Sequence, residues 1–426
     1  MCATGRNCLS WHGSTAQLIV TEPDLIKEIL NNKSGVYIKP KPVSFMKKLL
    51  GNGLATSEGK KWAKQRKLAN HAFHAENLKN MVPAMLTSVE MMLERWRQFE
   101  GKEMEVFEEF KVATSDVISR SAFGSSYFEG AKIFENLNKL AAMAVGNANK
   151  IRLPVIGKLL KTSDEIESEK VENRIRESFI HMIRTRQEKM KNGEIDGLGC
   201  DYLGFLLREN QDVDDNKRIS IEDVIDECKT FFFAGYETTT SLLAWSVLLL
   251  AIHTDWQDRA RKEVLEIFEG KSPTPEDNGI AKLKTMTMII NETLRLYPPI
   301  VAIYRNVSRE TKIGDLFLPG NIEVLIPCLV SHSDPEVWGV DAHLFKPDRF
   351  AEGVTKAAKN TMAYLPFGLG PRACVGLNFA MIEVKLSLSM ILQRYAFTLS
   401  PTYVHSPVQR MSTRPHHGVQ IILHAL

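Results

Sequence analysis

The sequence contains no hydrophobic run long enough to cross a bilayer. A spanning helix needs about 20 apolar residues, and the longest candidate, residues 241–252, is shorter than this. The first residues, MCATGRNCLSWHG, also lack the apolar stretch of a signal peptide. The chain as written therefore predicts a protein that is soluble or peripheral to a membrane, and residues 241–252 are better explained as a buried helix.

The sequence also has few cysteines and little excess of positive over negative charge. The six cysteines of the 426 residues are scattered and form no C-x-x-C pair, which excludes a disulfide framework or a zinc finger and is typical of a reducing compartment. Because 54 basic residues oppose 51 acidic ones, the net charge is only +3, and no nucleic-acid binding is expected. Hydrophobic residues make up 44%, enough for a large core with room for a cofactor cavity.

Long stretches with little proline indicate helices. Residues 60–188 have helical periodicity, with interruptions at 123–126 and 154–157. Residues 220–223, Ser-Ile-Glu-Asp, resemble a capping box, and no proline follows until Pro273. We therefore predict one helix from about residue 221 to 253, about 50 Å long at about 1.5 Å per residue.

Beyond Pro299 the residue pattern changes to short runs of β-branched residues separated by glycine and proline, which is typical of strands. The fold class predicted from these patterns is mainly α-helical with a smaller β-rich part. We expect helices over residues 50–298 and 375–395, and strands near residues 1–40, 300–330 and 400–426.

One loop combines a cysteine with glycines and a cation. Residues 367–376 read F-G-L-G-P-R-A-C-V-G and run into a predicted helix. Backbone N–H groups near a helix N-terminus stabilise a thiolate at Cys374, and the glycines allow a flat ligand to approach the backbone closely. Arg372 offers a cation to a carboxylate. The alternative is a buried free cysteine beside a helix, which is a common use of cysteine.

The whole string matches F-x-x-G-x-R-x-C-x-G, and the chain thereby resembles the cytochrome P-450 haem-thiolate monooxygenases. The resemblance implies a single catalytic domain over residues 1–426, with haem b between the long helix and the helix after the cysteine. It makes Cys374 the axial iron ligand, whose electron donation favours O–O cleavage. By the same resemblance the cofactor is also bound by Phe367, Gly368, Arg372 and Gly376.

A second motif, Glu292-Thr-Leu-Arg295, matches the E-x-x-R of the family, with both charges on one helix face. The pattern alone is not specific, because Glu94-Arg-Trp-Arg97 fits it as well. Its position before the cysteine loop, with Arg349 between the two, implies the buried charge network of the family, in which these residues are structural. A surface salt bridge is the alternative for either piece.

The middle of the predicted long helix reads A-G-Y-E-T-T at residues 234–239. Glycine and threonine are poor residues for a helix interior, so we expect a functional reason for them. The segment matches A-G-x-[DE]-T-[TS] of the family, and the resemblance assigns catalytic roles to Glu237 and Thr238, which would organise protons and water at bound dioxygen. A Ser/Thr-rich turn that bonds its own backbone is the alternative.

Trp62-Ala-Lys-Gln-Arg66 matches the W-x-x-x-R of the family's propionate-binding helix, and Arg305 lies where the family often has another propionate-binding arginine. The lysines around this tryptophan are Lys60, Lys61, Lys64 and Lys67. In the family the corresponding helix faces an acidic electron donor, and the lysines are therefore predicted to steer a reductase. A solvated charged face is the alternative.

Several stretches look like the plant seventy-two clan, whose members oxidise apolar scaffolds such as terpenoids and plant steroid hormones. This resemblance implies that one oxygen atom of O₂ is inserted, as a hydroxylation, into a small hydrophobic substrate. Electrons would come from NADPH through a separate NADPH-cytochrome reductase, because no nucleotide-binding fingerprint occurs, and we expect a monomer. The predicted walls of the substrate pocket include Phe233, Ala234, Ile300 and Val301.

The N-terminus departs from the family pattern. Microsomal members begin with an anchor that holds them on the cytosolic face of the endoplasmic reticulum, whereas this chain resembles a member truncated before the first strand. Two alternatives remain for the function. One is a same-fold hydroperoxide isomerase or dehydratase, although such enzymes tend to lose the acid–threonine pair. The other is a protein that is not an enzyme, either an inactive, truncated and haem-free product or a passive lipid-binding protein. NADPH dependence and haem content distinguish them.

Overall fold

The computed structural model describes residues 7–13, 15–148, 161–195, 197–214, 218–274 and 278–426. Its internal contacts divide the chain into two compact units. Unit 1 consists of Met1–Pro40, Val89–Phe110 and Thr238–Leu426, and unit 2 consists of Lys41–Ser88 and Lys111–Glu237. The single domain expected from the sequence stays a prediction.

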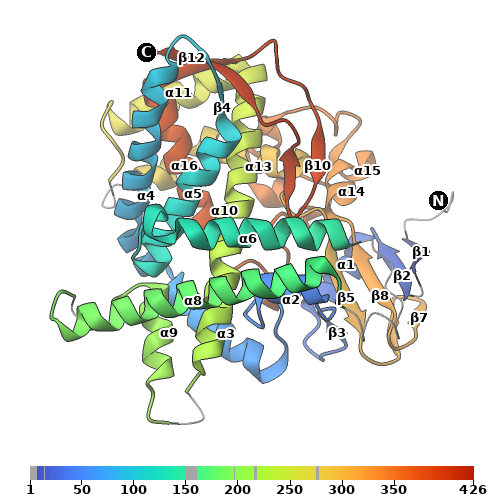
Figure 1. The fold of residues 1–426 in the computed structure, drawn as a ribbon. Helices are drawn as coiled ribbons and strands as arrows, with labels where there is room; N and C mark the ends of the chain where they lie inside the picture. Colours follow the sequence, from blue (N-terminus) through green and yellow to red (C-terminus); the bar gives the residue numbers. More distant parts are fainter. Residues whose placement is uncertain (1–6, 14, 149–160, 196, 215–217, 275–277) are drawn as a thin grey trace. The chain divides into compact units, whose positions relative to one another are not determined.

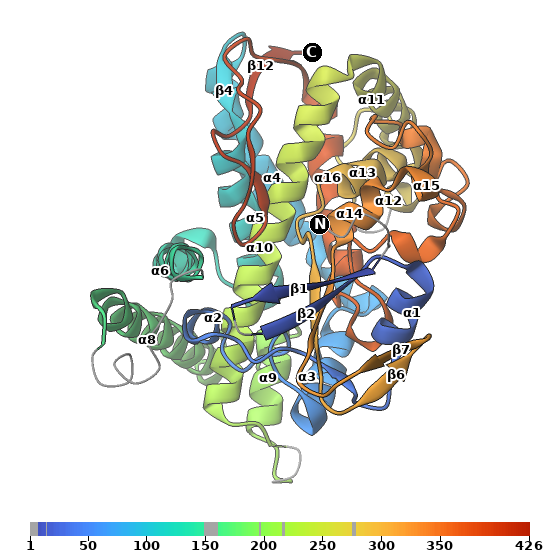
Figure 2. The same cartoon turned by 90° about the vertical axis from the view of Figure 1, so that its right-hand side faces the viewer.

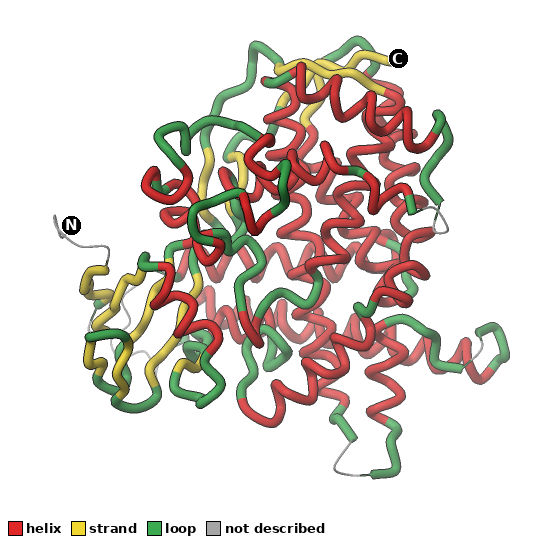
Figure 3. Tube along the Cα trace, turned by 180° about the vertical axis from the view of Figure 1, so that it is seen from behind, coloured by secondary structure: helices red, strands yellow, loops and turns green. Residues whose placement is uncertain are grey.

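Unit 2 is built from helices. Those wholly within it are α2 (Ser44–Leu50), α3 (Gly59–Ala72), α6 (Tyr127–Asn147), α8 (Ser163–Lys191) and α9 (Tyr202–Asn210). Three longer helices continue from one unit into the other, namely α4 (Ala75–Trp96), α5 (Val106–Phe123) and α10 (Ile221–Ile252). The described part of unit 2 contains no strand (Figure 3).

Unit 1 holds every strand of the described residues, together with further helices. The helices are α1 (Pro23–Asn31), α11 (Thr254–Phe268), α12 (Gly279–Lys282), α13 (Lys284–Leu296), α14 (Cys328–Ser333), α15 (Pro335–Trp338) and α16 (Leu377–Arg394). Short 3-10 helices lie at Arg97–Phe99, Pro347–Phe350, Val354–Lys356, Thr361–Ala363 and Gly370–Arg372. The strands are β1 (Asn7–His12), β2 (Thr15–Val20), β3 (Tyr37–Ile38), β4 (Glu103–Glu105), β5 (Ile303–Val307), β6 (Thr311–Ile313), β7 (Leu316–Leu318), β8 (Glu323–Ile326), β9 (Tyr395–Leu399), β10 (Pro407–Gln409), β11 (Thr413–Pro415) and β12 (Gln420–Ala425).

The larger sheet of unit 1 has five strands in the order β1-β2-β8-β5-β3, all of which are labelled in Figure 1, and Figure 2 shows β1 and β2 side by side. Strands β2 and β8 pair in parallel although they are far apart in the sequence. Helix α1 begins at Pro23, whose fixed φ suits the first helical position, and it buries Ile26 and Leu30 against strand residues such as Val324. The β-rich portion expected at the N-terminus therefore shares one sheet with β5 and β8 of the portion expected near residues 300–330, whose other strands, β6 and β7, form a separate two-stranded sheet.

A second sheet contains three strands in the order β4-β12-β9, and it includes the β-rich portion expected at the C-terminus. Strand β4 lies within the portion expected to be helical, residues 50–298, and is an exception to that pattern, because Glu103–Glu105 pair with β12. Three residues carry no local strand signal. Their pairing with a segment from the other end of the chain decides their conformation.

Helix α10 confirms the predicted long helix, since it covers Ile221–Ile252. Its first turn has the expected capping box, in which the Asp223 N–H donates to Ser220 Oγ at 3.1 Å and the Ser220 N–H donates to Asp223 Oδ2 at 3.0 Å. Residues 241–251 are all buried, as predicted for a core helix. Within the described ranges, no helix is both long and apolar enough to cross a membrane.

Aromatic side chains form part of the core of unit 2. The Phe232 ring of α10 lies 4.2 Å from Phe123 of α5, and 5.2 Å from both Phe134 of α6 and Phe179 of α8. Such ring pairs add to the stability that buried area provides. Helices α6 and α8 lie side by side on this core (Figure 1). The interruption predicted at 123–126 separates α5 from α6, and the one at 154–157 lies outside the described residues.

Candidate functional site

The cysteine loop of unit 1 is a hydrogen-bonded turn between the 3-10 helix Gly370–Arg372 and α16. The Cys374 N–H donates to the Phe367 carbonyl oxygen at 2.8 Å. Cys374 lies two residues before Gly376, the N-cap of α16, where the helix dipole favours a negative charge. The loop therefore restrains the backbone from which the thiol projects.

Glycines let this loop follow its path. Gly368 and Gly370 have φ angles of +69° and +71°, in the left-handed region that is costly for residues with a Cβ. A Cβ on Gly370 would also lie 2.3 Å from the Leu30 carbonyl oxygen. A Cβ on Gly376 would meet only Cys374 Sγ, at 3.9 Å, so this glycine leaves room beside the thiol.

The Cys374 side chain is exposed, which contradicts the alternative of a buried structural cysteine. In the described part of the chain, the buried cysteines are Cys228 and Cys328. Burial raises the pKa of Cys328 to about 12 and the pKa of Cys228 well above its usual value. Because a cysteine ligates a metal as the thiolate, Cys374 suits a metal ligand, whereas the two buried thiols suit packing.

Helix α13 holds a fully buried ion pair. Glu292 and Arg295 have no exposed side-chain surface, and they form two parallel hydrogen bonds, Nε to Oε2 at 2.8 Å and Nη2 to Oε1 at 2.7 Å. Arg295 also donates to the carbonyl oxygens of His332, Ala342 and Leu344 at 2.6–3.1 Å. All five guanidinium N–H groups thus have acceptors, and this condition allows a buried charge to be tolerated.

Arg349 lies beside the same carboxylate. Its Nε is 3.4 Å from Glu292 Oε1, and its Nη2 is 2.7 Å from Asp341 Oδ1. The Lys346 N–H also donates to Glu292 Oε1 at 2.9 Å. The structure therefore brings together the predicted network of Glu292, Arg295 and Arg349, and burial excludes the alternative of surface salt bridges.

His332, which sequence reasoning missed, connects this network to the cysteine loop. Its carbonyl accepts from Arg295, and its ring Nε2 accepts from the Leu365 N–H at 2.9 Å, two residues before Phe367. Because burial lowers the pKa of His332 to about 3, the imidazole stays neutral and Nε2 remains an acceptor at physiological pH. A lone histidine in a short helix gives no sequence signal for this role.

The acid–threonine segment lies within α10, where unit 2 ends at Glu237 and unit 1 begins at Thr238. The Glu237 side chain is largely buried, with 8% exposure. Ala234 is exposed although the neighbouring Phe233 and Tyr236 are buried.

Gly235 has a packing role in this segment. A Cβ there would lie 2.7 Å from Ile118 Cγ1 of α5, so glycine allows the two helices to approach. The Thr114 hydroxyl of α5 donates to the Tyr236 carbonyl oxygen at 3.3 Å. Residues 234–239 were singled out for their low helix propensity. At Gly235 that choice of residue is explained by helix packing, in addition to any catalytic reason.

A family model described as Cytochrome P-450 matches residues 2–422. The chain belongs to the cytochrome P-450 family. It is 54% identical over 424 residues to a Panax ginseng protein named Cytochrome P-450 CYP749A22, with 99% of this chain and 80% of that protein covered. It is 43% identical over 432 residues to the 11-oxo-beta-amyrin 30-oxidases of Medicago truncatula and Glycyrrhiza uralensis, with 99% and 81% covered.

A solved structure shows the same fold. The haem domain of cytochrome P-450DA aligns with a TM-score of 0.83 over 99% of this chain and 89% of that chain, at 23% identity. The protein is therefore an oxidoreductase of the cytochrome P-450 monooxygenase type with the expected mainly α-helical fold. The plant relatives also agree with the resemblance to the seventy-two clan.

Haem iron is the cofactor that this cytochrome P-450 family implies, and the cysteine loop fits it. The thiol is exposed, the positive-φ glycines keep backbone without side chains near it, and Gly376 leaves space beside Sγ. A flat macrocycle needs such a bare surface next to its axial ligand.

The predicted propionate-binding residues lie in different units. Arg305 of unit 1 is 8% exposed and donates from Nη1 to its neighbour's carbonyl, Tyr304 O, at 2.8 Å. Trp62 and Arg66 are half-buried on α3 of unit 2, and Arg66 Nε donates to Asn70 Oδ1 at 2.9 Å. That these side chains converge on one cofactor stays a prediction. The same holds for the predicted pocket walls, Phe233 and Ala234 in unit 2 and Ile300 and Val301 in unit 1.

Two of the four lysines predicted to meet a reductase have partners within unit 2. Lys61 forms an ion pair with Asp223, and Lys64 Nζ donates to the Arg218 carbonyl oxygen at 3.1 Å. The other two lysines, Lys60 and Lys67, are exposed. The lysine pattern around the tryptophan therefore contains one pair that holds α3 in place and one pair that is open to solvent.

Helix α10 also holds the loop before α3, a contact that sequence reasoning missed. Asp226 Oδ2 accepts from the Asn52 N–H at 2.9 Å, and the Thr230 hydroxyl donates to the Leu50 carbonyl oxygen at 2.8 Å. A Cβ on Gly53 would lie 2.4 Å from Thr230 Oγ1, so glycine is needed for this approach. The loop precedes Trp62, and α10 thereby positions the helix that carries it.

Glu227 is buried beside these contacts, with 1% exposure. Burial raises the pKa of Glu227 to about 7, although a hydrogen bond from the Tyr202 hydroxyl at 2.7 Å opposes the shift. This carboxyl therefore changes charge near neutral pH. No motif marks it, because the shift depends on what packs around it.

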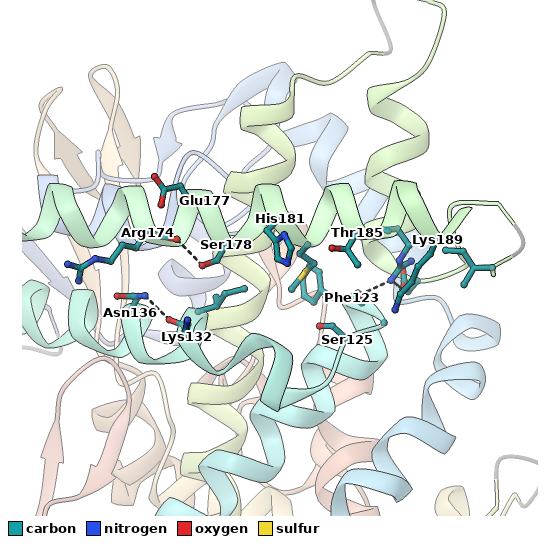
Figure 4. A pocket seen from close by; sticks show the side chains of 17 residues that line it. Phe123, Ser125, Lys132, Asn136, Arg174, Glu177, Ser178, His181, Thr185 and Lys189 are labelled. Carbon is teal, nitrogen blue, oxygen red and sulfur yellow. Dashed lines mark hydrogen bonds and ion pairs between the residues drawn. The ribbon is translucent and has the colours of Figure 1, made fainter. Parts of the chain in front are cut away.

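A pocket of about 990 Å³ lies between α6 and α8 of unit 2 (Figure 4). Its lining includes residues of both helices and of the loops that follow α5 and α8. None of the predicted haem, catalytic or substrate residues lines it. It is therefore not the substrate pocket expected from the sequence.

Proposed function

We propose that this cytochrome P-450 hydroxylates a small apolar molecule of the terpenoid or steroid type, with Cys374 as the haem-iron ligand. The observation that carries the proposal is the exposed thiol on a restrained loop at the start of α16. Bound haem b would supply oxygen activation, which a thiolate ligand promotes. The residues proposed to hold it are Phe367, Gly368, Arg372, Gly376, Arg305, Trp62 and Arg66.

Glu237 and Thr238 are proposed to hold and pass protons. A carboxylate with little access to water beside a hydroxyl is the pairing that general acid–base transfer needs. We expect Glu237→Gln and Thr238→Ala to lower product formed per NADPH consumed while haem content stays unchanged. Full coupling in both variants would exclude this role.

Electrons are proposed to come from NADPH through a separate flavoprotein reductase that meets the exposed lysines of α3. The double variant Lys60→Glu/Lys67→Glu should slow reduction by the reductase, because steering depends on charge, and leave reduction by dithionite unchanged. Lys27→Glu/Lys33→Glu, also a double charge reversal, serves as the control. An equal rate of reduction by the reductase in the wild type and both double variants would exclude this docking site.

The terpenoid class is supported by similarity. Relatives that are 43% identical to this chain are named 11-oxo-beta-amyrin 30-oxidases. The proposed walls Phe233, Ala234, Ile300 and Val301 are apolar, as a terpenoid scaffold requires. Products formed from a panel of triterpenes and steroids, with and without NADPH and reductase, test both the class and the need for electrons.

The difference spectrum of the reduced protein with carbon monoxide tests the iron ligand. We expect a strongly red-shifted Soret band in the wild type that disappears in Cys374→Ala and persists in Cys200→Ala, which removes another exposed cysteine. A haem-free wild type would refute the proposed function. An unchanged band in Cys374→Ala would refute the assigned ligand.

A further inference from the structure

We propose that the groove between α6 and α8 is a second binding site, for a small amphipathic anion with an apolar body and one carboxylate or similar group. The groove lies within unit 2 and has a volume of about 990 Å³, at the upper end of the roughly 300–1,000 Å³ typical of ligand sites. Since no residue of the proposed monooxygenase site lines it, the inference goes beyond that function.

The floor of the groove is apolar. Phe123 and Ile133 line it and are buried, and Met182 and Ile195 line it and are half-buried. Phe123 also packs on Phe232 in the aromatic core, so the floor is a continuation of a rigid interior. An apolar ligand body would remove the remaining floor surface from water, which is the main favourable contribution to binding such a molecule.

The rim of the groove carries more positive than negative charge. Lys132 of α6 lines it together with Arg174 and Lys189 of α8, and Glu177 is the acidic residue on the rim. Among the described residues none of these three cations forms an ion pair. Figure 4 shows Lys132 and Arg174 toward one end of the groove and Lys189 toward the other. An anionic group therefore has a cation within reach at either end.

A buried ion pair builds one end of the groove. Arg186 donates from Nη2 to Asp201 Oδ2 at 2.7 Å and to the Phe123 carbonyl oxygen at 2.7 Å. Its Nη1 donates to Asp201 Oδ1 at 3.1 Å and to the Leu198 carbonyl oxygen at 3.0 Å. Because this pair joins the loops after α5 and α8 to α8 itself, the end wall exists before any ligand binds, and binding loses less conformational entropy.

Two glycines allow the loops to reach that ion pair. Gly124 and Gly199 have φ angles of +54° and +89°. A Cβ on Gly124 would lie 2.3 Å from Nη2 of Arg186, and a Cβ on Gly199 would lie 2.6 Å from its Nη1. The charge of Arg186 is thus committed to the wall, and the charges left for a ligand are those of the rim.

Titration of the haem-containing protein with dodecanoate, an amphipathic anion, tests the site. Binding is measured by calorimetry while the haem absorption band is recorded, because a ligand beside the iron perturbs that band and a ligand in this groove does not. We expect heat of binding with no change in the band. The neutral analogue dodecanol is expected to bind at least about fivefold more weakly.

Charge-reversal variants test whether the ligand binds in the groove. The double variant Arg174→Glu/Lys189→Glu should weaken dodecanoate binding by about twentyfold or more, and each single reversal by about threefold, because the ligand can still place its carboxylate at the other end. Arg184→Glu makes the same change on an exposed face of α8 outside the groove, and it should leave the affinity within about twofold. The milder Arg174→Gln and Lys189→Gln should produce smaller losses in the same order.

Three results would overturn the proposal. They are the absence of any heat outside the haem site, equal affinity for dodecanol and dodecanoate, and equal weakening by Arg184→Glu and the rim variants. None of these results bears on the monooxygenase function, which the carbon monoxide spectrum tests separately.

Discussion

Unit 1 contains the E-x-x-R pattern twice, and both copies form an ion pair, but one is exposed to solvent and the other is buried. Glu94 and Arg97 form an ion pair at 3.0 Å with side chains that are 47% and 65% exposed. Glu292 and Arg295 form one at 2.7 Å with no exposed side-chain surface. Spacing along the chain therefore sets the distance between the charges, whereas burial sets how much the protein depends on them.

The two pairs differ in their contribution to stability because one is exposed to solvent and the other is not. Water and salt screen the Glu94–Arg97 pair, and such surface pairs contribute about 0–1 kcal/mol. In the buried copy Arg295 also satisfies carbonyl oxygens of three residues, so its loss leaves a desolvated carboxylate and orphaned acceptors. The following predictions compare buried and exposed charges, from the largest expected effect to the smallest.

The largest effect is expected at the buried copy. Arg295→Ala should lower the free energy of unfolding by about 3–5 kcal/mol, because the buried Glu292 would lose its two shortest guanidinium contacts and keep only Arg349 and the Lys346 N–H beside it. Urea unfolding followed by circular dichroism measures the loss, and haem content shows whether the cysteine loop survives. Arg97→Ala is the matched control, and equal losses in the two variants would contradict the role of burial.

The second prediction concerns Glu227, a buried carboxyl whose hydrogen-bond partner is the Tyr202 hydroxyl and not a cation. Its pKa of about 7 lies above the ordinary 4.5, so the unfolded chain releases this proton first as the pH rises. The free energy of unfolding should therefore fall by about 3 kcal/mol from pH ~4.5 to pH ~7 on account of this group, and level off above. Glu227→Gln should lack this part of the fall in unfolding series at several pH values.

Glu222 on the same helix provides a control of opposite sign. A hydrogen bond from Arg176 lowers the pKa of this exposed carboxyl, so its small contribution to stability is present above its ordinary pKa and is lost as the pH falls. Glu222→Gln should leave the decline between pH ~4.5 and pH ~7 in place. A decline that is the same in Glu227→Gln as in the wild type would mean that Glu227 is solvated.

An intermediate effect is expected at Arg349. Arg349→Lys keeps the charge beside Glu292 but loses the forked contacts of the guanidinium with Trp338 and Asp341, at a cost of about 1–2 kcal/mol. Thermal unfolding with Lys346→Ala as control measures it, because Lys346 contacts Asp341 from a side chain that is 51% exposed. A larger loss in the control would show that Asp341, and not the fork, matters.

The smallest effect is expected at the exposed copy. A double-mutant cycle of Glu94→Ala and Arg97→Ala should give a coupling below about 0.5 kcal/mol that vanishes in about 1 M salt. Urea midpoints of the four proteins at low and high salt provide the measurement. A coupling that persists in high salt would show that this pair is shielded from solvent.

Much of the fold follows from local patterns. The start of α10 at the capping box of Ser220 and Asp223 needs only neighbouring residues, and so does the proline at the first position of α1. The short strand Glu103–Glu105 could not be predicted this way, because it pairs with β12, which lies more than 300 residues further along the chain. Pairing between distant segments overrides weak local propensity.

The candidate site divides in the same way. The glycines, arginine and cysteine of residues 367–376 are adjacent in sequence, so their pattern could be recognised directly. His332 and Glu227 could not, since the first acts through Leu365 and the second through Tyr202. Their altered pKa values come from burial among segments that lie far away along the chain.

The sequence by itself determined the order of the motifs, the long helix and the cysteine loop, because each depends on residues within a few turns of one another. Only the tertiary structure decided which E-x-x-R pair is buried, that Cys374 is exposed while Cys328 is not, and that α6 and α8 enclose a groove with a charged rim. Burial is a property of packing between distant segments, and two ion pairs with the same sequence spacing have different energies when their surroundings differ.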